Sequence, residues 1–201
     1  MHLETLRLVI RDLEVADVPG LVKLWTDPDA TRYMGGPRDE AGLRASLEED
    51  LEGDAPRFDL WPALDKASGE LVGHCGLLEK SVDGVPEIEL VYVLARAAWG
   101  RGLGTEAAGR LRDYAFTELG LGRLIALIDP ENIASGRVAT KLGFRLEKTT
   151  VRPGGRLMHV YALAKPEVAT DSSRDEAVRV GSRRKGWAQA GEGSLGSSVD
   201  G

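Results

Sequence analysis

The sequence predicts an α+β fold, with one mixed, mostly antiparallel sheet of about six or seven strands, a central parallel pair and flanking helices. Apolar segments with strand-like alternation, bounded by short turns, recur along the chain. Between some of them lie segments whose apolar residues are three or four positions apart, as in amphipathic helices. Residues 87–128 have the order strand, helix, strand, which predicts one right-handed parallel crossover.

The first half of the chain contains two predicted helices and three predicted strands. Residues 5–11 alternate well enough for a first strand, and the helix that follows ends before Pro28. The apolar face of this helix consists of Val18, Leu21, Val22 and Trp25. An acidic helix is expected over residues 40–51, and a hairpin is expected from strands over 58–64 and 71–77.

The second half begins with the central strand, after a turn at Asp83-Gly84. The further expected elements are a strand from residue 87, a helix to about 119, a strand over 123–128, a helix ending at 143, and strands over 144–151 and 156–164. Asp129 is the expected N-cap of the last helix, with Pro130 as its first residue, because these residue types are favoured there.

Composition excludes several classes of protein. The chain has 201 residues, 42% hydrophobic and 29% charged, which is typical of a soluble globular protein. No apolar run approaches the ~20 residues that span a bilayer, and the N-terminus lacks the features of a signal peptide. Cys75 is the single cysteine, and no Cys/His cluster has metal-ligand spacing. We therefore expect a cytoplasmic protein with no membrane partner and no metal.

The formal net charge of −6 and the pI near 5.2 argue against nucleic acid as a partner and are compatible with a cationic substrate. Residues 166–201 are rich in Gly, Ser and charged side chains and show no sustained period. We expect a disordered polar tail there, behind one domain formed by residues 1–165.

Three glycines at alternate positions, Gly100, Gly102 and Gly104, separate the central strand from the next helix. Glycine permits positive φ and a close approach to the backbone, and a helix N-terminus presents unpaired amides at the positive end of its dipole. Such an arrangement binds phosphate or diphosphate without a basic side chain. Residues 102–107 also match the dinucleotide pattern G-x-G-x-x-A, but the mid-chain position and the single crossover argue against a Rossmann domain.

The segment from Trp99 to Ala107, Trp-Gly-Arg-Gly-Leu-Gly-Thr-Glu-Ala, resembles the acetyl-CoA pyrophosphate loop of the GNAT superfamily of N-acetyltransferases. A second segment agrees with that family: Asn132-Ile133-Ala134-Ser135, then Val138, then Lys141-Leu142-Gly143-Phe144. The Trp-Gly form of the loop resembles the ribosomal-protein N-terminal acetyltransferase branch (RimJ/RimL-like). The resemblance covers about residues 3–164.

The resemblance implies a GNAT-type acyl-CoA N-acyltransferase fold and acetyl-CoA as co-substrate. It implies transfer of the acetyl group to a primary amine by direct attack on the thioester in a ternary complex. The central strand would pair with the pantetheine arm, and the loop would bind the diphosphate. The implied cofactor-binding residues are Leu90, Val91, Tyr92, Val93, Trp99, Arg101, Gly102, Leu103, Gly104, Thr105, Glu106, Asn132 and Ser135.

Three residues are candidates for catalysis. Glu89 is the candidate general base, acting through a water, and Glu87 on the same strand face could share its polar cleft, where one carboxylate raises the pKa of the other. By position alone, two solvated strand carboxylates near a hairpin turn explain the pair equally well, and the resemblance favours the role of Glu89 as base. The resemblance implies that Asn132 bonds the pantetheine or orients the thioester, although an asparagine that caps a helix explains the residue nearly as well. It also implies that Ser135 lies near the CoA sulfur, where Ser135 or water protonates the departing thiolate, because the tyrosine that many members use four residues later is Ala139 here.

The amine acceptor stays open between a protein N-terminus and a small molecule such as an amino acid, a polyamine or an aminoglycoside. A non-catalytic module that binds acyl-CoA is the first alternative, and a dinucleotide-binding oxidoreductase is a less favoured one. The oligomeric state stays open, and a homodimer is the commonest choice for small enzymes.

Overall fold

The computed structural model describes residues 1–53 and 56–166. The tail predicted to begin at residue 166 therefore lies outside the described residues from position 167 onward. Within the described part of the chain, every helix is too short or too polar to cross a membrane.

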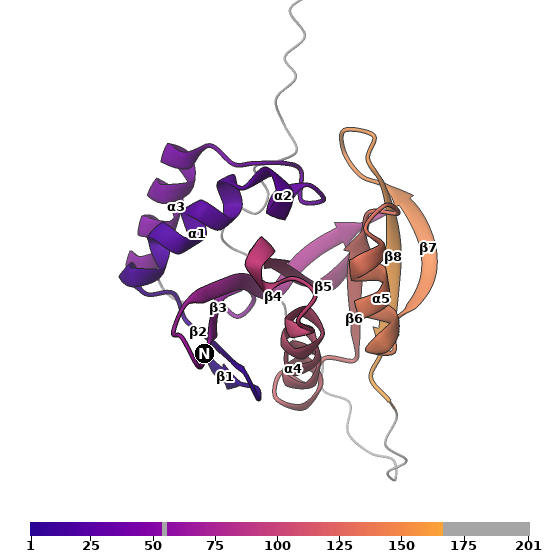
Figure 1. The fold of residues 1–201 in the computed structure, drawn as a ribbon. Helices are drawn as coiled ribbons and strands as arrows, with labels where there is room; N and C mark the ends of the chain where they lie inside the picture. The colour runs from indigo at the N-terminus through magenta and orange to yellow at the C-terminus, as the bar shows by residue number, and fades with distance from the viewer. Residues whose placement is uncertain (54–55, 167–201) are drawn as a thin grey trace, which may run out of the picture.

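One sheet of eight strands runs through the described residues in the order β1-β2-β3-β4-β5-β6-β8-β7 (Figure 1). The strands are β1 (His2–Glu4), β2 (Leu8–Arg11), β3 (Leu60–Asp65), β4 (Leu71–Val82), β5 (Val85–Leu94), β6 (Arg123–Ile128), β7 (Arg145–Val151) and β8 (Leu157–Ala164). All neighbours pair antiparallel except β5 and β6, which are parallel. The predicted mixed sheet with a central parallel pair is confirmed.

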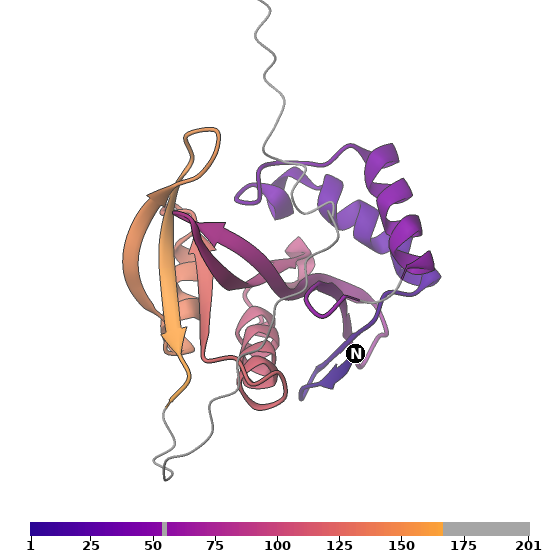
Figure 2. The same cartoon turned by 180° about the vertical axis from the view of Figure 1, so that it is seen from behind.

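The helices cover both faces of the sheet. They are α1 (Val18–Thr26), α2 (Pro28–Thr31), α3 (Glu40–Glu52), α4 (Leu103–Thr117) and α5 (Ile133–Lys141). Figures 1 and 2 show α1, α2 and α3 on one side of the β3–β5 region and α4 on the other. Alternation along β5 matches these layers, because Leu90 and Leu94 belong to the core cluster under α4, whereas Val91 and Val93 belong to the cluster under α1 and α3.

The sheet has one strand more than the seven segments expected, because β1 (His2–Glu4) lies ahead of the segment predicted as a strand over 5–11. Of that segment only β2 (Leu8–Arg11) is a strand, and residues 5–7 form the turn that joins it to β1. The amide of Thr5 donates to the Leu8 carbonyl at 3.0 Å, and the Leu8 amide donates to Thr5 Oγ1 at 2.8 Å. A threonine hydroxyl that bonds a nearby amide stabilises a turn, which simple alternation of apolar residues does not reveal.

The prediction that Asp129 caps α5 is wrong. Asn132 is the N-cap, and its side chain accepts from the Ser135 amide at 3.1 Å. Asp129 Oδ1 accepts instead from the Glu131 amide at 2.9 Å, and the Asp129 carbonyl accepts from the Asn132 amide at 2.8 Å. Asp129 and Pro130 therefore form a turn ahead of the helix, and the helix starts at Ile133.

The two parallel strands touch at one point only. Glu89 on β5 pairs with Ile125 on β6, and no further pair joins these strands although both continue past it. Beyond Glu89 the carboxyl ends of the strands diverge, and the backbone groups that face the gap are open to a ligand. The split of the sheet is the feature that positions the site.

Candidate active site

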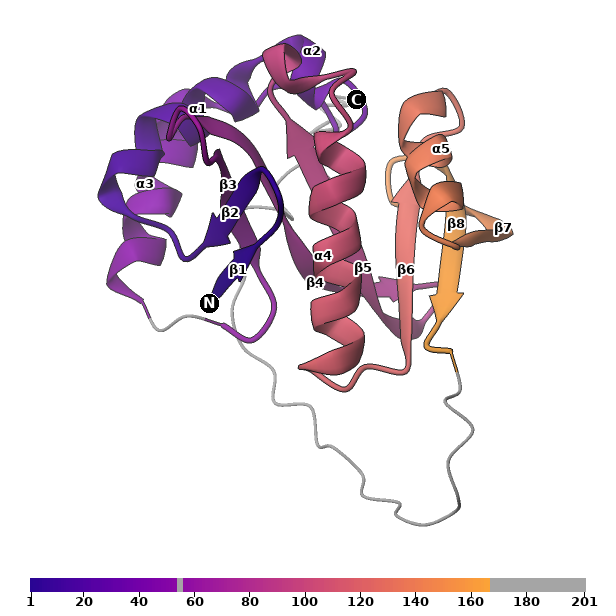
Figure 3. The ribbon, with the colours of Figure 1, turned by 60° about the horizontal axis from the view of Figure 1, so that its bottom comes forward.

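A cavity of about 620 Å³ opens where β5 and β6 separate. Its walls come from the carboxyl ends of these two strands, from the N-terminal turns of α4 and α5, and from the segment between α1 and α3. Figure 3 shows α4 and α5 on the same side of the sheet, close to β5 and β6. The lining is mostly apolar with a few polar groups, as in small-molecule sites.

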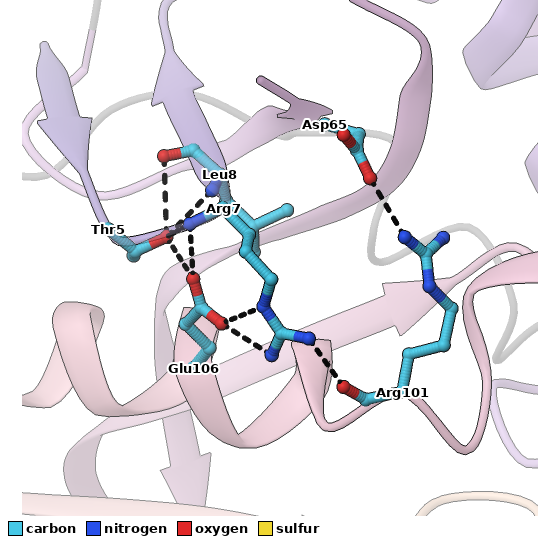
Figure 4. A network of polar contacts seen from close by, with 6 residues as sticks. All are labelled: Thr5, Arg7, Leu8, Asp65, Arg101 and Glu106. Atoms are coloured by element: carbon cyan, nitrogen blue, oxygen red, sulfur yellow. Dashed lines mark hydrogen bonds and ion pairs between the residues drawn. The ribbon is translucent and has the colours of Figure 1, made fainter. Parts of the chain in front are cut away.

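Most of the residues predicted to bind a cofactor line this cavity. They are Leu90, Val91, Tyr92, Val93, Trp99, Gly102, Leu103, Gly104, Thr105, Asn132 and Ser135. Arg101 and Glu106 do not line it, because their side chains turn towards the N-terminal hairpin. Arg101 donates to Asp65 at 3.0 Å, and Glu106 accepts from Thr5 and Arg7 (Figure 4).

The start of α4 leaves its first amides open. Gly100 and Gly102 have φ of 71° and 77°, a conformation that glycine adopts without strain. Gly102 is the N-cap and makes no side-chain cap. Among the described residues, no carbonyl accepts from the backbone amides of residues 100–105, and the first amide bonded inside the helix is that of Glu106, which donates to the Gly102 carbonyl at 3.1 Å. Open amides at the positive end of a helix dipole are the features that anion sites use.

Gly104 brings the first turn of α4 close to β5. A Cβ there would lie 3.2 Å from Tyr92 Cε2 and 3.4 Å from Leu94 Cδ1. The ring of Tyr92 therefore packs against the glycine loop, and a larger residue at position 104 would push α4 away from the strand.

Glu89 stands at the point where the strands separate. Its side chain is 8% exposed, it lines the cavity, and its Oε1 accepts from the Leu127 amide of β6 at 3.3 Å. By alternation it lies on the same sheet face as Val91 and Val93, opposite to Tyr92.

Glu87 does not share the cleft of Glu89, contrary to the hypothesis of two coupled carboxylates. Glu87 pairs with Arg123 at 3.1 Å, and Arg123 also pairs with Glu147 at 2.9 Å. Glu87 does not line the cavity. The guanidinium of Arg123, which the sequence pattern did not connect to Glu87, pairs with Glu87 outside the cavity, whereas Glu89 lines the cavity.

Tyr92 and Ser135 meet on the other face of the sheet. The Tyr92 hydroxyl donates to Ser135 Oγ at 3.2 Å, and burial raises the pKa of Tyr92, so that the hydroxyl stays protonated at neutral pH. The sequence analysis placed the Tyr92 backbone at the cofactor but missed its side chain. Its position between Leu90 and Leu94, on the helix-covered face, was the signal that could have found it.

Contacts among three segments hold the part of the cavity wall that contains Tyr33 and Asp129. Arg156 Nη2 donates to the Tyr33 carbonyl at 2.6 Å and to Asp129 Oδ2 at 3.0 Å. The Tyr33 hydroxyl donates to the Glu131 carbonyl at 3.3 Å. Tyr33 and Asp129 line the cavity. The sequence carried no motif in these loops, so their convergence was not predicted.

Two titratable side chains of β4 lie outside the cavity. His74 accepts from Trp25 Nε1 at 3.1 Å, and burial lowers its pKa to about 3, which keeps it neutral. Burial raises the pKa of Cys75 to about 12, so its thiol is unreactive at neutral pH. In the described part of the chain, no cluster of three His, Cys, Asp or Glu could hold a metal ion.

Known proteins are similar to this chain in sequence or in fold. The profile of a family described as Acetyltransferase (GNAT) domain matches residues 7–145. Uncharacterized protein YkkB of Bacillus subtilis (strain 168) is 36% identical over 161 residues, which cover 79% of this chain and 93% of YkkB. Uncharacterized N-acetyltransferase p20 of Bacillus licheniformis is 35% identical over 181 residues, which cover 83% and 98% of the two chains.

A solved structure has the same architecture. The crystal structure of an acetyltransferase (GNAT family) from Bacillus anthracis superposes with a TM-score of 0.72 at 27% identity, covering 83% of this chain and all of that one. The profile match to residues 7–145 includes both the glycine loop and the start of α5.

Proposed function

The chain belongs to the GNAT acetyltransferase family, and from this premise we propose that it transfers the acetyl group of acetyl-CoA to a primary amine. Attack on the thioester would be direct, within a ternary complex. One observation carries the proposal: the sheet splits beyond Glu89, and the resulting cavity has a carboxylate on one face and a hydroxyl pair on the other.

The residues present fit the co-substrate. Acetyl-CoA supplies an acetyl group activated as a thioester. The open amides of residues 100–105 are suited to its diphosphate, because they offer donors at a helix N-terminus without any basic side chain. The backbone of β5 from Leu90 to Val93 lacks a partner strand at the gap and can pair with the amide groups of pantetheine.

Glu89 is the proposed general base. Its carboxylate is nearly buried and is held at the mouth of the gap by the Leu127 amide. It lies on the side of the sheet where α2 and the loop after it form the cavity wall, which we assign to the amine. There it would take the proton of the attacking ammonium group, through a water.

Ser135 is the proposed acid for the departing thiolate. A serine hydroxyl has one proton to donate, and acceptance of a hydrogen bond from Tyr92 leaves that proton free for another partner. Base and acid then lie on opposite faces of the split sheet. This placement suits a reaction in which the amine arrives on one side and the thiolate leaves on the other.

Asn132 has two proposed functions. Its Oδ1 caps α5 by accepting from the Ser135 amide, which supports the capping interpretation and places Ser135. Its Nδ2 is the remaining donor of a side chain that lines the cavity, and it could orient the thioester.

The identity of the amine acceptor is the more specific part of the proposal. Glu89 gives the cavity a nearly buried carboxylate, which favours a cationic amine, whereas Arg156 offsets the charge of Asp129. The Trp99-Gly100 pair supports the RimJ/RimL-like branch and therefore a protein N-terminus as one acceptor. Other candidate acceptors are a polyamine, an amino acid and an aminoglycoside, because the loop after α2 carries no motif that selects any one of them.

The test is thiol release from acetyl-CoA by the purified protein with a panel of amines: N-terminal peptides, spermine, amino acids and an aminoglycoside. We expect amine-dependent CoA formation with at least one of them, and loss of it in Glu89→Gln. Binding of CoA without thiol release across the panel would instead favour a non-catalytic acyl-CoA module. A thermal shift with NAD(H) and none with CoA would favour an oxidoreductase.

A further inference from the structure

The N-terminal hairpin is joined to the first turn of α4 by a network that the proposed reaction does not use (Figure 4). Glu106 accepts from Thr5 Oγ1 at 2.5 Å, from the Arg7 amide at 2.7 Å and from Arg7 Nε at 2.7 Å. Arg7 Nη2 lies 2.6 Å from the second oxygen of the same carboxylate, Oε2. These contacts connect residues about 100 positions apart, so they are a product of the tertiary structure.

Arg7 also reaches the glycine loop itself. Its Nη1 donates to the Arg101 carbonyl at 2.8 Å. The chain has no cis peptide among the described residues, and in a trans peptide the carbonyl and the following N–H point in opposite directions. With the Arg101 carbonyl directed at Arg7, the amide of Gly102 is directed away from Arg7, and Gly102 lines the cavity.

The charges near the loop are paired so that the helix N-terminus stays open to an anion from outside. Burial acts to raise the pKa of Glu106, but hydrogen bonds from Thr5 and Arg7 outweigh burial and hold the pKa below its usual value. The carboxylate is therefore ionised, and Arg7 offsets its charge beside the anion site. The second arginine of the loop, Arg101, is turned to Asp65 at 3.0 Å.

We propose that Arg7 and Glu106 are positioning residues for co-substrate binding, which hold the Arg101–Gly102 peptide in the orientation that presents its amide to a diphosphate. The proposal rests on the function proposed above. It assigns the N-terminal hairpin a part in ligand binding, although no residue of that hairpin lines the cavity.

A purely structural role would be to hold the hairpin on the domain, and Lys66 provides the matched control. Lys66 Nζ donates to Glu4 Oε2 and to the Thr5 carbonyl, both at 2.7 Å. It therefore secures the same β1–β2 turn without a contact to the glycine loop.

The experiment compares Arg7→Lys with Lys66→Met by titration calorimetry with CoA. A lysine at position 7 keeps a positive charge for Glu106, but one nitrogen cannot replace the fork that reaches both Glu106 and the Arg101 carbonyl. We expect the Kd for CoA to rise about tenfold in Arg7→Lys, equivalent to about 1.4 kcal/mol, and to stay within about twofold in Lys66→Met.

Steady-state kinetics adds a second readout. S-acetylpantetheine carries the same thioester without the diphosphate, so KM for it should be equal in the wild type and Arg7→Lys, whereas KM for acetyl-CoA rises and kcat changes by less than about twofold. Glu106→Gln removes the ion pair, and its single amide oxygen cannot accept from every donor that the two carboxylate oxygens of Glu106 bind, so it should raise the Kd for CoA about threefold even if Arg7→Lys does not fold.

Equal weakening by Arg7→Lys and Lys66→Met, or no weakening by Arg7→Lys and Glu106→Gln, would overturn the positioning role. Wild-type protein that binds CoA but acetylates no amine would contradict the proposed function while leaving this comparison of affinities intact. Wild-type protein that binds no CoA would overturn both proposals.

Discussion

Two helices begin at the cavity, and they differ in whether a side chain accepts from their first backbone amides. α4 starts at a glycine in the left-handed conformation and has no side-chain cap. α5 starts at Asn132, whose side chain accepts from the Ser135 amide. An uncapped N-terminus leaves its amide donors and the positive end of its dipole available to a ligand. In a capped N-terminus, the cap side chain already accepts from one of these amides.

We expect this difference to separate the binding of acetyl-CoA, at the start of α4, from the chemical step, at the start of α5. The α4 end carries open amides, and the basic side chains nearest to it, Arg7 and Arg101, are paired with Glu106 and Asp65. The α5 end places Ser135 against Tyr92, and Glu89 lies across the split sheet. Changes at the first end should therefore act on affinity for acetyl-CoA, and changes at the second end should act on kcat.

The largest effect is expected from Glu89→Gln. Loss of a general base should lower kcat about 10²–10⁴-fold and remove the acid limb of its pH profile, with KM for acetyl-CoA nearly unchanged. Glu87→Gln is the control, because Glu87 lies two positions away on β5 but pairs with Arg123. An unchanged kcat and pH profile in Glu89→Gln would show that another group is the general base.

The next largest effect should come from adding a negative charge next to the open amides at the start of α4. Gly100 has φ of 71° and open space around a new Cβ, a conformation that Asp and Asn tolerate. A carboxylate there would repel a diphosphate by about 2 kcal/mol, so Gly100→Asp should raise the Kd for acetyl-CoA about 30-fold.

Gly100→Asn has the same backbone demand without the charge, and its effect should be only a few-fold. The difference between the two variants should shrink in 0.5 M salt, where charges are screened within about 4 Å. Equal Kd values for the Asp and Asn variants would mean that no anion binds at the start of α4.

A smaller effect is expected from Tyr92→Phe, which keeps the ring against Gly104 and removes the hydroxyl that donates to Ser135. The lost hydrogen bond is worth about 1 kcal/mol, so kcat should fall roughly fivefold with KM for acetyl-CoA unchanged. In Ser135→Ala, the further change Tyr92→Phe should have no effect, because the two side chains act as one unit.

The control for this pair is Tyr114→Phe on α4, whose ring packs edge-on against Trp61 at 6.4 Å and does not line the cavity. Additive losses in the double variant would show that Tyr92 and Ser135 act independently.

The smallest effect concerns stability. Asn132→Ala removes the cap of α5 and should cost about 1 kcal/mol of unfolding free energy, a fall in Tm of about 2–4 °C in a thermal melt. Asn132→Asp keeps an acceptor at the cap and should retain the wild-type Tm. If kcat also falls in Asn132→Asp, the Nδ2 group serves the thioester, and if kcat is unchanged, Asn132 only caps the helix.

The glycine loop, the central strand and the parallel crossover could be predicted because they are local. A run of apolar residues specifies the strand, three glycines at alternate positions specify the loop, and helical spacing of apolar residues specifies the helix. These patterns depend little on the rest of the chain. The family resemblance of the same segment is confirmed by the match over residues 7–145. The position of Glu89 at the cavity followed from its place on that strand.

Contacts between distant segments could not be predicted, since one sequence does not tell which side chains meet. The same pattern placed Glu87 beside Glu89, but Arg123 on another strand takes Glu87 out of the cavity. Asp129 had the residue type of a cap, yet Asn132 caps the helix because the turn at Asp129 delays its start.

By itself the sequence determined the α+β fold and the glycine loop ahead of α4, because propensity, alternation and positive φ are properties of short segments. Only the tertiary structure decided which groups face one another across the split sheet. Tyr92 donates to Ser135, and Arg7 holds both Glu106 and the Arg101 carbonyl, because strands and helices far apart in the chain pack at a fixed register. The physical reason is that hydrogen-bond partners are selected by distance in space, which the order of residues alone does not encode.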